Sequence, residues 1–158
     1  MSQFMQEKWS MFEGTHGMRT ELLDTLSDAD LAYTPGGQAM TFGALWKQMG
    51  EIEHAYTESI KTRTQDWSYH SPEPGLETSV AQLKAWFQKL DEDMKMTVEA
   101  LADNEFKQTV KRDSGYEAPI EMQLDFYIQA ALIFFGKASI YVRAMNRPLT
   151  KSMADWIW

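Results

Sequence analysis

The stretch 129–149, QAALIFFGKASIYVRAMNRPL, contains the most apolar run of the chain, and it decides the fold class. It predicts a helix over 120–145, because apolar side chains recur at alternating steps of three and four. One such stripe comprises Ile120, Leu124, Tyr127, Ala131, Phe134, Ala138, Tyr141 and Met145. A second stripe beside it comprises Phe126, Ala130, Ile133, Lys137 and Ile140. Two adjacent stripes predict a helix covered on more than one side, by neighbouring helices or by a second subunit.

Three further segments, 3–26, 41–62 and 79–102, have the same helical period. Thr41 is an expected N-cap, and Ser79 has the capping-box spacing to Gln82. In the first segment, His16 and Arg19 fall on the same side as the apolar residues Trp9 and Phe12. Gly14 and Gly17 lower the helix propensity there, so we expect a kink or a close helix contact at these glycines.

Two turn-rich loops complete the chain, at residues 63–78 and 103–118, and the second has the composition of a small hairpin or an ordered loop. No series of strands is evident. The sequence therefore predicts an all-α protein, a single domain over 1–158 built as an antiparallel four-helix bundle, with long loops after the second and third helices.

The charge and residue composition excludes several functions. Fifteen basic against 23 acidic residues give a net charge of −8, which argues against nucleic acid and against anionic membrane surfaces. The chain has no cysteine, so thiolate metal sites and cysteine nucleophiles are excluded. No secretion signal is evident, and the longest apolar run is interrupted by polar residues, so we expect a cytoplasmic protein.

Few residues have the pattern of a catalytic site. Glu51 and His54 form a single Glu-x-x-His motif, whereas carboxylate-bridged di-iron bundles need two, and the chain has only three histidines, at 16, 54 and 70. A mononuclear metal site would ordinarily need three histidine or carboxylate ligands. No strained nucleophile motif and no phosphate-binding glycine motif is present. The residues alone identify neither a catalytic group nor a cofactor.

Two sequence regions, in their order along the chain, resemble those of a known family. The pieces DADLAYTPGGQAMTFGALWKQMGEIEHAY and FFGKASIYVRAMNRPL are similar to the signature regions of the DinB-like superfamily, bacterial four-helix bundles that include thiol-dependent S-transferases and maleylpyruvate isomerases. The resemblance covers nearly the whole chain. It implies a divalent metal held by three histidines, and the corresponding positions here are Gln48, Ala130 and Phe134. Because methyl and phenyl groups cannot coordinate a cation, we expect no metal and no cofactor.

Three hypotheses for function follow from this resemblance. In the first, the chain binds a small apolar ligand or a protein partner through a residual cleft near Gln48, Ala130, Phe134, Glu51 and His16, with Gln48 facing inward and bonded to His16 or to a backbone carbonyl. In the second, it is a metal-dependent hydrolase or thiol transferase with His16, Glu51 and His54 as substitute ligands. In the third, it is a structural homodimer, which the doubled stripe of 120–145 and the late aromatics Trp156 and Trp158 suggest, although a tail that folds back onto its own bundle also explains these aromatics and is the explanation we favour. We favour a filled or narrowed pocket over a new active site.

Overall fold

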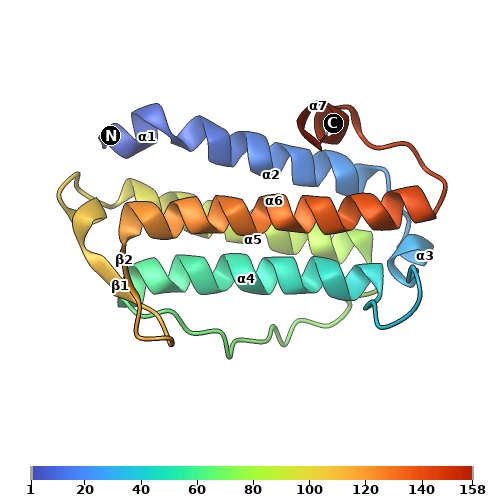
Figure 1. Ribbon diagram of the computed structural model, residues 1–158, viewed down its shortest axis with the longest axis horizontal. Coiled ribbons are helices and arrows are strands. Elements are labelled where there is room, and N and C mark those ends of the chain that lie inside the picture. Colours follow the sequence, from blue (N-terminus) through green and yellow to red (C-terminus); the bar gives the residue numbers. More distant parts are fainter. Residues whose placement is uncertain (1, 158) are drawn as a thin grey trace.

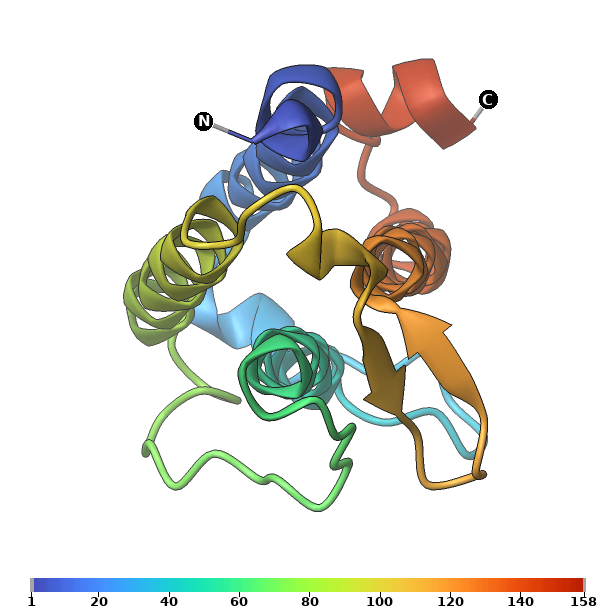
Figure 2. The same ribbon diagram turned by 90° about the vertical axis from the view of Figure 1, so that its left-hand side faces the viewer.

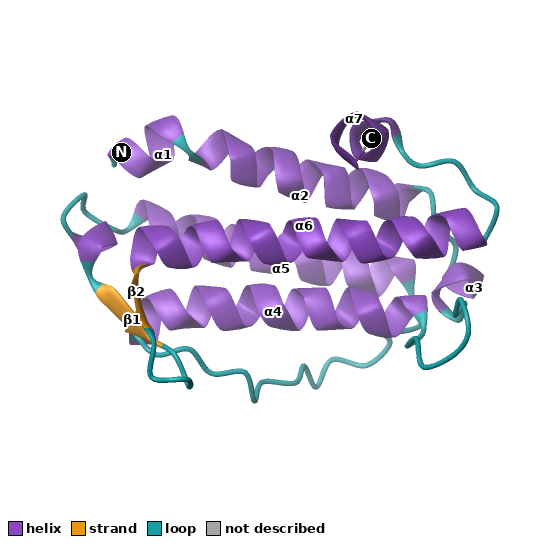
Figure 3. Ribbon diagram, viewed as in Figure 1, coloured by secondary structure: helices purple, strands orange, loops and turns teal. Residues whose placement is uncertain are grey.

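The computed structural model describes residues 2–157 and shows a mostly helical protein with one small antiparallel sheet (Figure 3). The all-α prediction is confirmed in this broad sense, and Trp158 lies outside the described residues. In chain order the elements are α1 (Gln3–Glu7), α2 (Trp9–Asp24), α3 (Asp28–Leu31), α4 (Phe42–Thr62), α5 (Val80–Glu99), the 3-10 turn η1 (Glu105–Lys107), β1 (Thr109–Lys111), β2 (Glu117–Pro119), α6 (Ile120–Ala144) and α7 (Lys151–Ile157).

The predicted caps set where the helices begin. The Thr41 hydroxyl accepts a hydrogen bond from the Ala44 amide at 3.2 Å, and α4 begins at the next residue. Ser79 does the same for the Gln82 amide at the start of α5. These side chains satisfy backbone donors that the first helical turn leaves without intrahelical partners. The two predicted helix starts are therefore confirmed.

The first helical segment is interrupted at Lys8 rather than at its glycines. Lys8 separates α1 from α2, whereas Gly14 and Gly17 lie within the unbroken α2. A methyl group added to either glycine would meet no atom within 4 Å, so no helix packs closely against them. The predicted kink at these positions was wrong, because the surrounding turns keep their hydrogen bonds and glycine only lowers helix propensity.

The four long helices α2, α4, α5 and α6 lie side by side, and α4 and α5 run in the same direction (Figures 1 and 2). Asp28, just after α2, accepts a hydrogen bond from the Val80 amide at the start of α5, and Gly43 at the start of α4 lies against Glu77. The predicted antiparallel arrangement was therefore wrong for this pair, because the consecutive long helices α4 and α5 are parallel. Loop 63–78 can reach back along α4, since about 16 extended residues span roughly 50 Å and a 21-residue helix only about 32 Å.

Apolar side chains from all four long helices form one continuous core. The predicted first stripe of α6 belongs to it, from Ile120 to Tyr141. Within the single chain the second stripe is only partly covered, because Ile133 is 60% and Ile140 59% exposed, so coverage by a second subunit stays a prediction. Among the described elements, α4 and α2 flank α6, and α7 and the hairpin also contact it, but the face that carries Ile133 and Ile140 is left to solvent (Figure 2).

Loop 103–118 forms the predicted hairpin, in which Val110 of β1 pairs with Ala118 of β2. The hairpin leads directly into α6, since the Ile120 amide donates to the Gln108 carbonyl. At the other end of the molecule, α7 folds back beside α2 and α6, and its Met153 is fully buried (Figure 1). No helix within residues 2–157 has the length and apolar content needed to cross a bilayer.

Candidate functional site

The three positions that correspond to the family metal site lie together on one groove. Gln48 of α4 and Ala130 and Phe134 of α6 line a hollow of about 200 Å³ between the two helices. The other lining residues are mostly apolar: Leu45, Met49, Ile52, Ile133 and Lys137. The groove is open and shallow, because Phe134 packs edge-on against Trp46 at a ring separation of 4.7 Å and fills its floor.

Gln48 does not face the core as predicted. Its side chain is exposed, and the buried face of α4 is instead centred on Trp46, Met49 and Glu53. His16 lies elsewhere, bonded to Tyr127 and Asp91, so the expected bond between Gln48 and His16 was wrong. The physical reason is that the inward face of α4 is rotated toward Glu53, a residue that hydropathy alone assigns to solvent.

The groove does not fit the metal that the resemblance implies. Its floor presents the Ala130 methyl and the Phe134 ring, neither of which has a lone pair to donate. Gln48 supplies a single amide, and the adjacent Lys137 would repel a cation. No metal-dependent step can therefore be assigned to this groove.

Glu51, His54 and His16 do not come together as substitute ligands. The Glu51 Oε1 accepts a hydrogen bond from the Ser71 amide at 2.9 Å, and its Oε2 lies 3.3 Å from His70 Nδ1. These contacts tie loop 63–78 to α4. His54 stacks on Tyr69 of the same loop at a ring separation of 3.8 Å. The proposed ligand set was wrong, and the described residues place these side chains in separate structural contacts.

The molecule contains a buried polar network that joins all four long helices. Arg19 of α2 donates from Nη1 to Glu53 Oε2 of α4 at 2.5 Å and from Nη2 to Asp91 Oδ1 of α5. His16 places Nδ1 2.9 Å from Asp91 Oδ1 and Nε2 2.8 Å from the hydroxyl of Tyr127 on α6. The Tyr127 hydroxyl donates to Glu53 Oε2 at 2.9 Å. Arg19, Glu53 and Tyr127 are essentially inaccessible to solvent.

Burial and charge displace the pKa values of this network in different directions. Burial raises the pKa of Glu53 above its ordinary value, against the opposing charges of Arg19 and His16. Burial would also raise the pKa of Asp91, but the hydrogen bond from His16 and the charge of Arg19 outweigh it and lower this pKa to about 2. Burial, and then the charge of Glu53, raise the pKa of Tyr127, so the phenol keeps its proton.

The hydrogen-bond geometry fixes one proton of the network. The pKa of Asp91 is lowered, so its carboxylate only accepts and His16 donates to it from Nδ1. The Arg19 guanidinium lies between Glu53 and Asp91 and supplies the positive charge that a buried pair of acids needs.

His16, Glu53 and Asp91 also qualify by type and distance as metal ligands, since their ligand atoms lie within 4.8 Å of one another. Glu53 Oε1 has no hydrogen-bond partner among the described residues. However, the Arg19 guanidinium already bridges both carboxylates and stacks on Phe87 at 4.0 Å. A divalent ion would add two positive charges beside the Arg19 guanidinium and would have to displace this buried side chain. We therefore interpret the network as structural.

A hollow of about 290 Å³ between α2 and α5 reaches the outer edge of the network. His16 and Asp91 form part of its wall, together with Gly17. Glu53 and Tyr127 do not line it. Both ring nitrogens of His16 are already bonded within the network, so this histidine offers no free nitrogen to the hollow.

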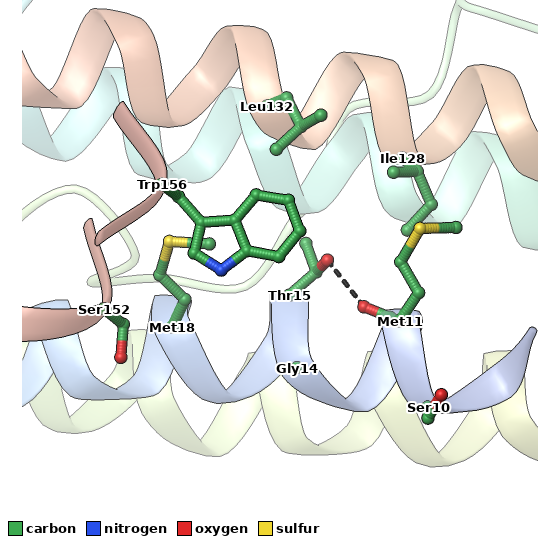
Figure 4. A pocket seen from close by; sticks show the side chains of 9 residues that line it. All are labelled: Ser10, Met11, Gly14, Thr15, Met18, Ile128, Leu132, Ser152 and Trp156. Carbon is green, nitrogen blue, oxygen red and sulfur yellow. Dashed lines mark hydrogen bonds between the residues drawn. The ribbon is translucent and has the colours of Figure 1, made fainter. Parts of the chain in front are cut away.

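A larger, apolar hollow lies on the opposite side of α2, between α2, α6 and α7 (Figure 4). Its volume is about 490 Å³, and none of the described residues that line it is charged. Figure 4 shows the Trp156 indole extending from α7 across the hollow toward Thr15. The Thr15 hydroxyl donates to the Met11 carbonyl at 2.7 Å. The lining residues are Ser10, Met11, Gly14, Thr15, Met18, Ile128, Leu132, Ser152 and Trp156.

Sequence reasoning missed this hollow, although part of its signal is present. Met11, Gly14 and Met18 are spaced three and four residues apart on α2 and therefore share one face. This face differs from the one that carries His16 and Arg19. The expected fold-back of the C-terminal tail onto its own bundle is confirmed for α7, but periodicity alone could not place it beside α2 and α6.

Comparison of the chain with protein-family models and with curated proteins gives no match.

Proposed function

We propose that this protein binds a small, uncharged, apolar molecule in the hollow between α2, α6 and α7. The observation that carries the proposal is the hollow itself, whose volume of about 490 Å³ falls within the usual range of roughly 300–1,000 Å³ for ligand sites. The chemistry of its wall selects the ligand. A charged group placed there would lose its hydration and find no opposite charge among the lining residues.

The lining also suits a site that adapts to its ligand. Met11 and Met18 have flexible, polarisable side chains that repack around different shapes. Trp156 is 66% exposed, so a ligand beneath its indole would cover apolar surface that otherwise contacts water. Ser10 and Ser152 supply two hydroxyl groups at the edge of the hollow, which would orient a ligand bearing one polar atom.

We further propose that the four long helices are a DinB-like four-helix bundle that has lost the family metal site. The support is the resemblance of the two signature regions, together with the convergence of Gln48, Ala130 and Phe134 on one groove. Under this proposal the metal groove has been filled by Phe134, and binding has moved to the other side of α6. No metal-dependent activity is expected.

The binding proposal is tested by titrating the protein with N-phenyl-1-naphthylamine, an uncharged aromatic probe whose fluorescence rises in apolar surroundings. We expect saturable binding by the wild type. The variant Gly14→Leu places a side chain into the hollow without meeting any atom at Cβ, and should weaken binding about tenfold or more.

The matched control is Gly17→Leu, which makes the same change three residues along α2, in the hollow beside His16. Both variants replace a helical glycine by a better helix former, so neither should lower stability. Equal binding by wild type and Gly14→Leu, or a loss in Gly17→Leu alone, would overturn the proposal.

A second function is favoured by one specific observation. On α6 the apolar side chains of Ile133 and Ile140, two turns apart, are exposed, and so is the neighbouring Leu132. We propose that this part of α6 forms a homodimer, because exposed apolar surface marks interaction sites. Sedimentation equilibrium at micromolar concentration tests it, and a monomer at all concentrations would contradict it.

A further inference from the structure

The uncovered face of α6 has the spacing of a coiled-coil seam. Alternating steps of four and three residues relate its positions, which keeps them in line over three heptads. The seam consists of Met122, Phe126, Gln129, Ile133, Gly136, Ile140 and Arg143, all exposed or half-buried. The hairpin of the same chain already contacts its first two positions, with the Arg112 guanidinium 5.2 Å from the Phe126 ring and the Tyr116 hydroxyl 3.5 Å from Met122 Sδ. The open part of the seam runs from Gln129 to Arg143, and a helix packed along it would cover these side chains.

Gly136 gives the seam one hole. A Cβ built at Gly136 would meet nothing within 4 Å, so the backbone is open to a neighbouring helix. Ile133 lies one turn away and is the most exposed apolar side chain of the seam. Because the same stripe carries a projecting Ile133 and a gap at Gly136, the Ile133 of each copy can fill the gap of the other copy, as a twofold interface requires.

We propose that two copies of this chain pair through antiparallel α6 helices, with Ile133 of each copy seated on the partner's Gly136. This inference rests on the proposed homodimer and specifies its register. In this register the numbers of two facing residues, one from each copy, always sum to 269. The twofold axis therefore crosses α6 midway, between the backbone positions of Phe134 and Phe135. Ile140 meets the partner's Gln129, and every seam position from 126 to 143 finds a counterpart.

The charges of the chain fit this register. Each copy carries a net charge of −8, so two copies repel each other over most of their surface. Residues 126–154 contain no Asp or Glu, so the seam from Phe126 onward contributes no acidic repulsion of its own. Arg143 has no ion pair among the described residues, and the register brings it next to the partner's Asp125, which is half-exposed and lies 3.6 Å from Lys8 of its own chain. Lys137 would lie along the partner's Leu132, with its charged end in water.

The register is measured by electron–electron distances between spin labels. The chain has no cysteine, so single substitutions Glu121→Cys and Ala144→Cys place one label in each copy. Each residue rises about 1.5 Å, so the antiparallel register predicts separations of about 41 Å for 121 and about 29 Å for 144 along the helix axis. Pairing of Ile133 with the partner's Ile140 would instead give about 47 Å and about 23 Å. Equal, short distances at both sites would indicate parallel helices.

A substitution separates association from folding. Gly136→Leu improves helix propensity and meets no atom in its own chain, so the melting temperature of the dilute protein should rise. It also fills the hole that Ile133 occupies, and the dimer dissociation constant should increase about tenfold or more. Gly17→Leu, a control on α2, should leave the dissociation constant unchanged.

The outcomes distinguish the two levels of the proposal. A protein that sediments as a monomer at all micromolar concentrations overturns both the homodimer and this register. A dimer with other label distances, or one that Gly136→Leu does not weaken, overturns the register and leaves the homodimer standing. Dimerisation with distances near 41 and 29 Å supports both.

Discussion

Two regions of the molecule invert the usual distribution of polar and apolar side chains. In the interior, His16, Arg19, Glu53 and Tyr127 are buried together. On the surface, Ile133 and Ile140 of α6 are about 60% exposed. Each of these interior side chains has at least one hydrogen-bond partner on another helix, although Glu53 Oε1 and Arg19 Nε have none among the described residues. The interior side chains are therefore covered and bonded by their own chain, whereas Ile133 and Ile140 remain largely open to solvent.

This difference indicates where stability and binding are located. The network joins four helices, so substitutions of its members should lower the free energy of unfolding. The α6 face and the neighbouring apolar hollow expose apolar surface, and substitutions there should affect association or ligand binding rather than folding.

The largest effect is expected from Arg19→Met. The substitution preserves most of the side-chain volume but leaves Glu53 and Asp91 without their shared cation. Removing one member of a buried ion pair costs about 3 to 5 kcal/mol, and we expect the free energy of unfolding in urea to fall by that amount. Lys84→Met, which removes an exposed ion pair with Asp24, is the control and should cost less than about 1 kcal/mol. Equal losses in both variants would contradict the distinction.

A smaller, pH-dependent effect is expected at Asp91. Its pKa is about 2 in the folded protein, below the ordinary 3.8, so its contribution is present above pH 4 and is lost as the pH falls from about 4 to 2. Asp91→Asn should therefore be less stable than the wild type by about 2 kcal/mol near neutral pH. The difference should shrink toward zero at pH 2. Urea unfolding of both proteins across this range measures it, and a difference that is constant with pH would exclude this role.

The smallest effect on folding is expected at Ile140. Ile140→Gln changes a side chain that is 59% exposed and contacts little of its own chain. We expect the unfolding free energy of the dilute protein to change by no more than about 0.5 kcal/mol. Sedimentation of the same variant should show weaker dimers. A loss of several kcal/mol in dilute solution would mean that the face belongs to the core.

The sequence predicts the helices well, because their signals are local. Thr41 and Ser79 mark helix starts within a few residues of the amides they cap, and the periodicity from Ile120 to Tyr141 reports one buried face. The same signals placed His16 and Arg19 beside Trp9 on the inward side of the first segment. The structure confirms that orientation.

The features that the sequence did not predict depend on contacts between residues that are distant in the chain. Glu53 is of a residue type usually found at the surface, and its burial becomes favourable through Arg19, 34 positions earlier, and Tyr127, 74 positions later. Because this pairing was not visible, the inward face of α4 was placed toward Gln48 instead. The shared direction of α4 and α5 was missed for a related reason, since a 16-residue loop permits either direction and distant contacts decide.

The most direct test of ligand binding in the apolar hollow is a single two-dimensional NMR titration of the labelled protein with N-phenyl-1-naphthylamine. We expect the largest chemical-shift changes at Gly14, Leu132 and the Trp156 indole, which line the hollow, and no change at the Glu53 amide. Changes centred on Gln48 and Phe134, or no saturable change at any residue, would contradict it.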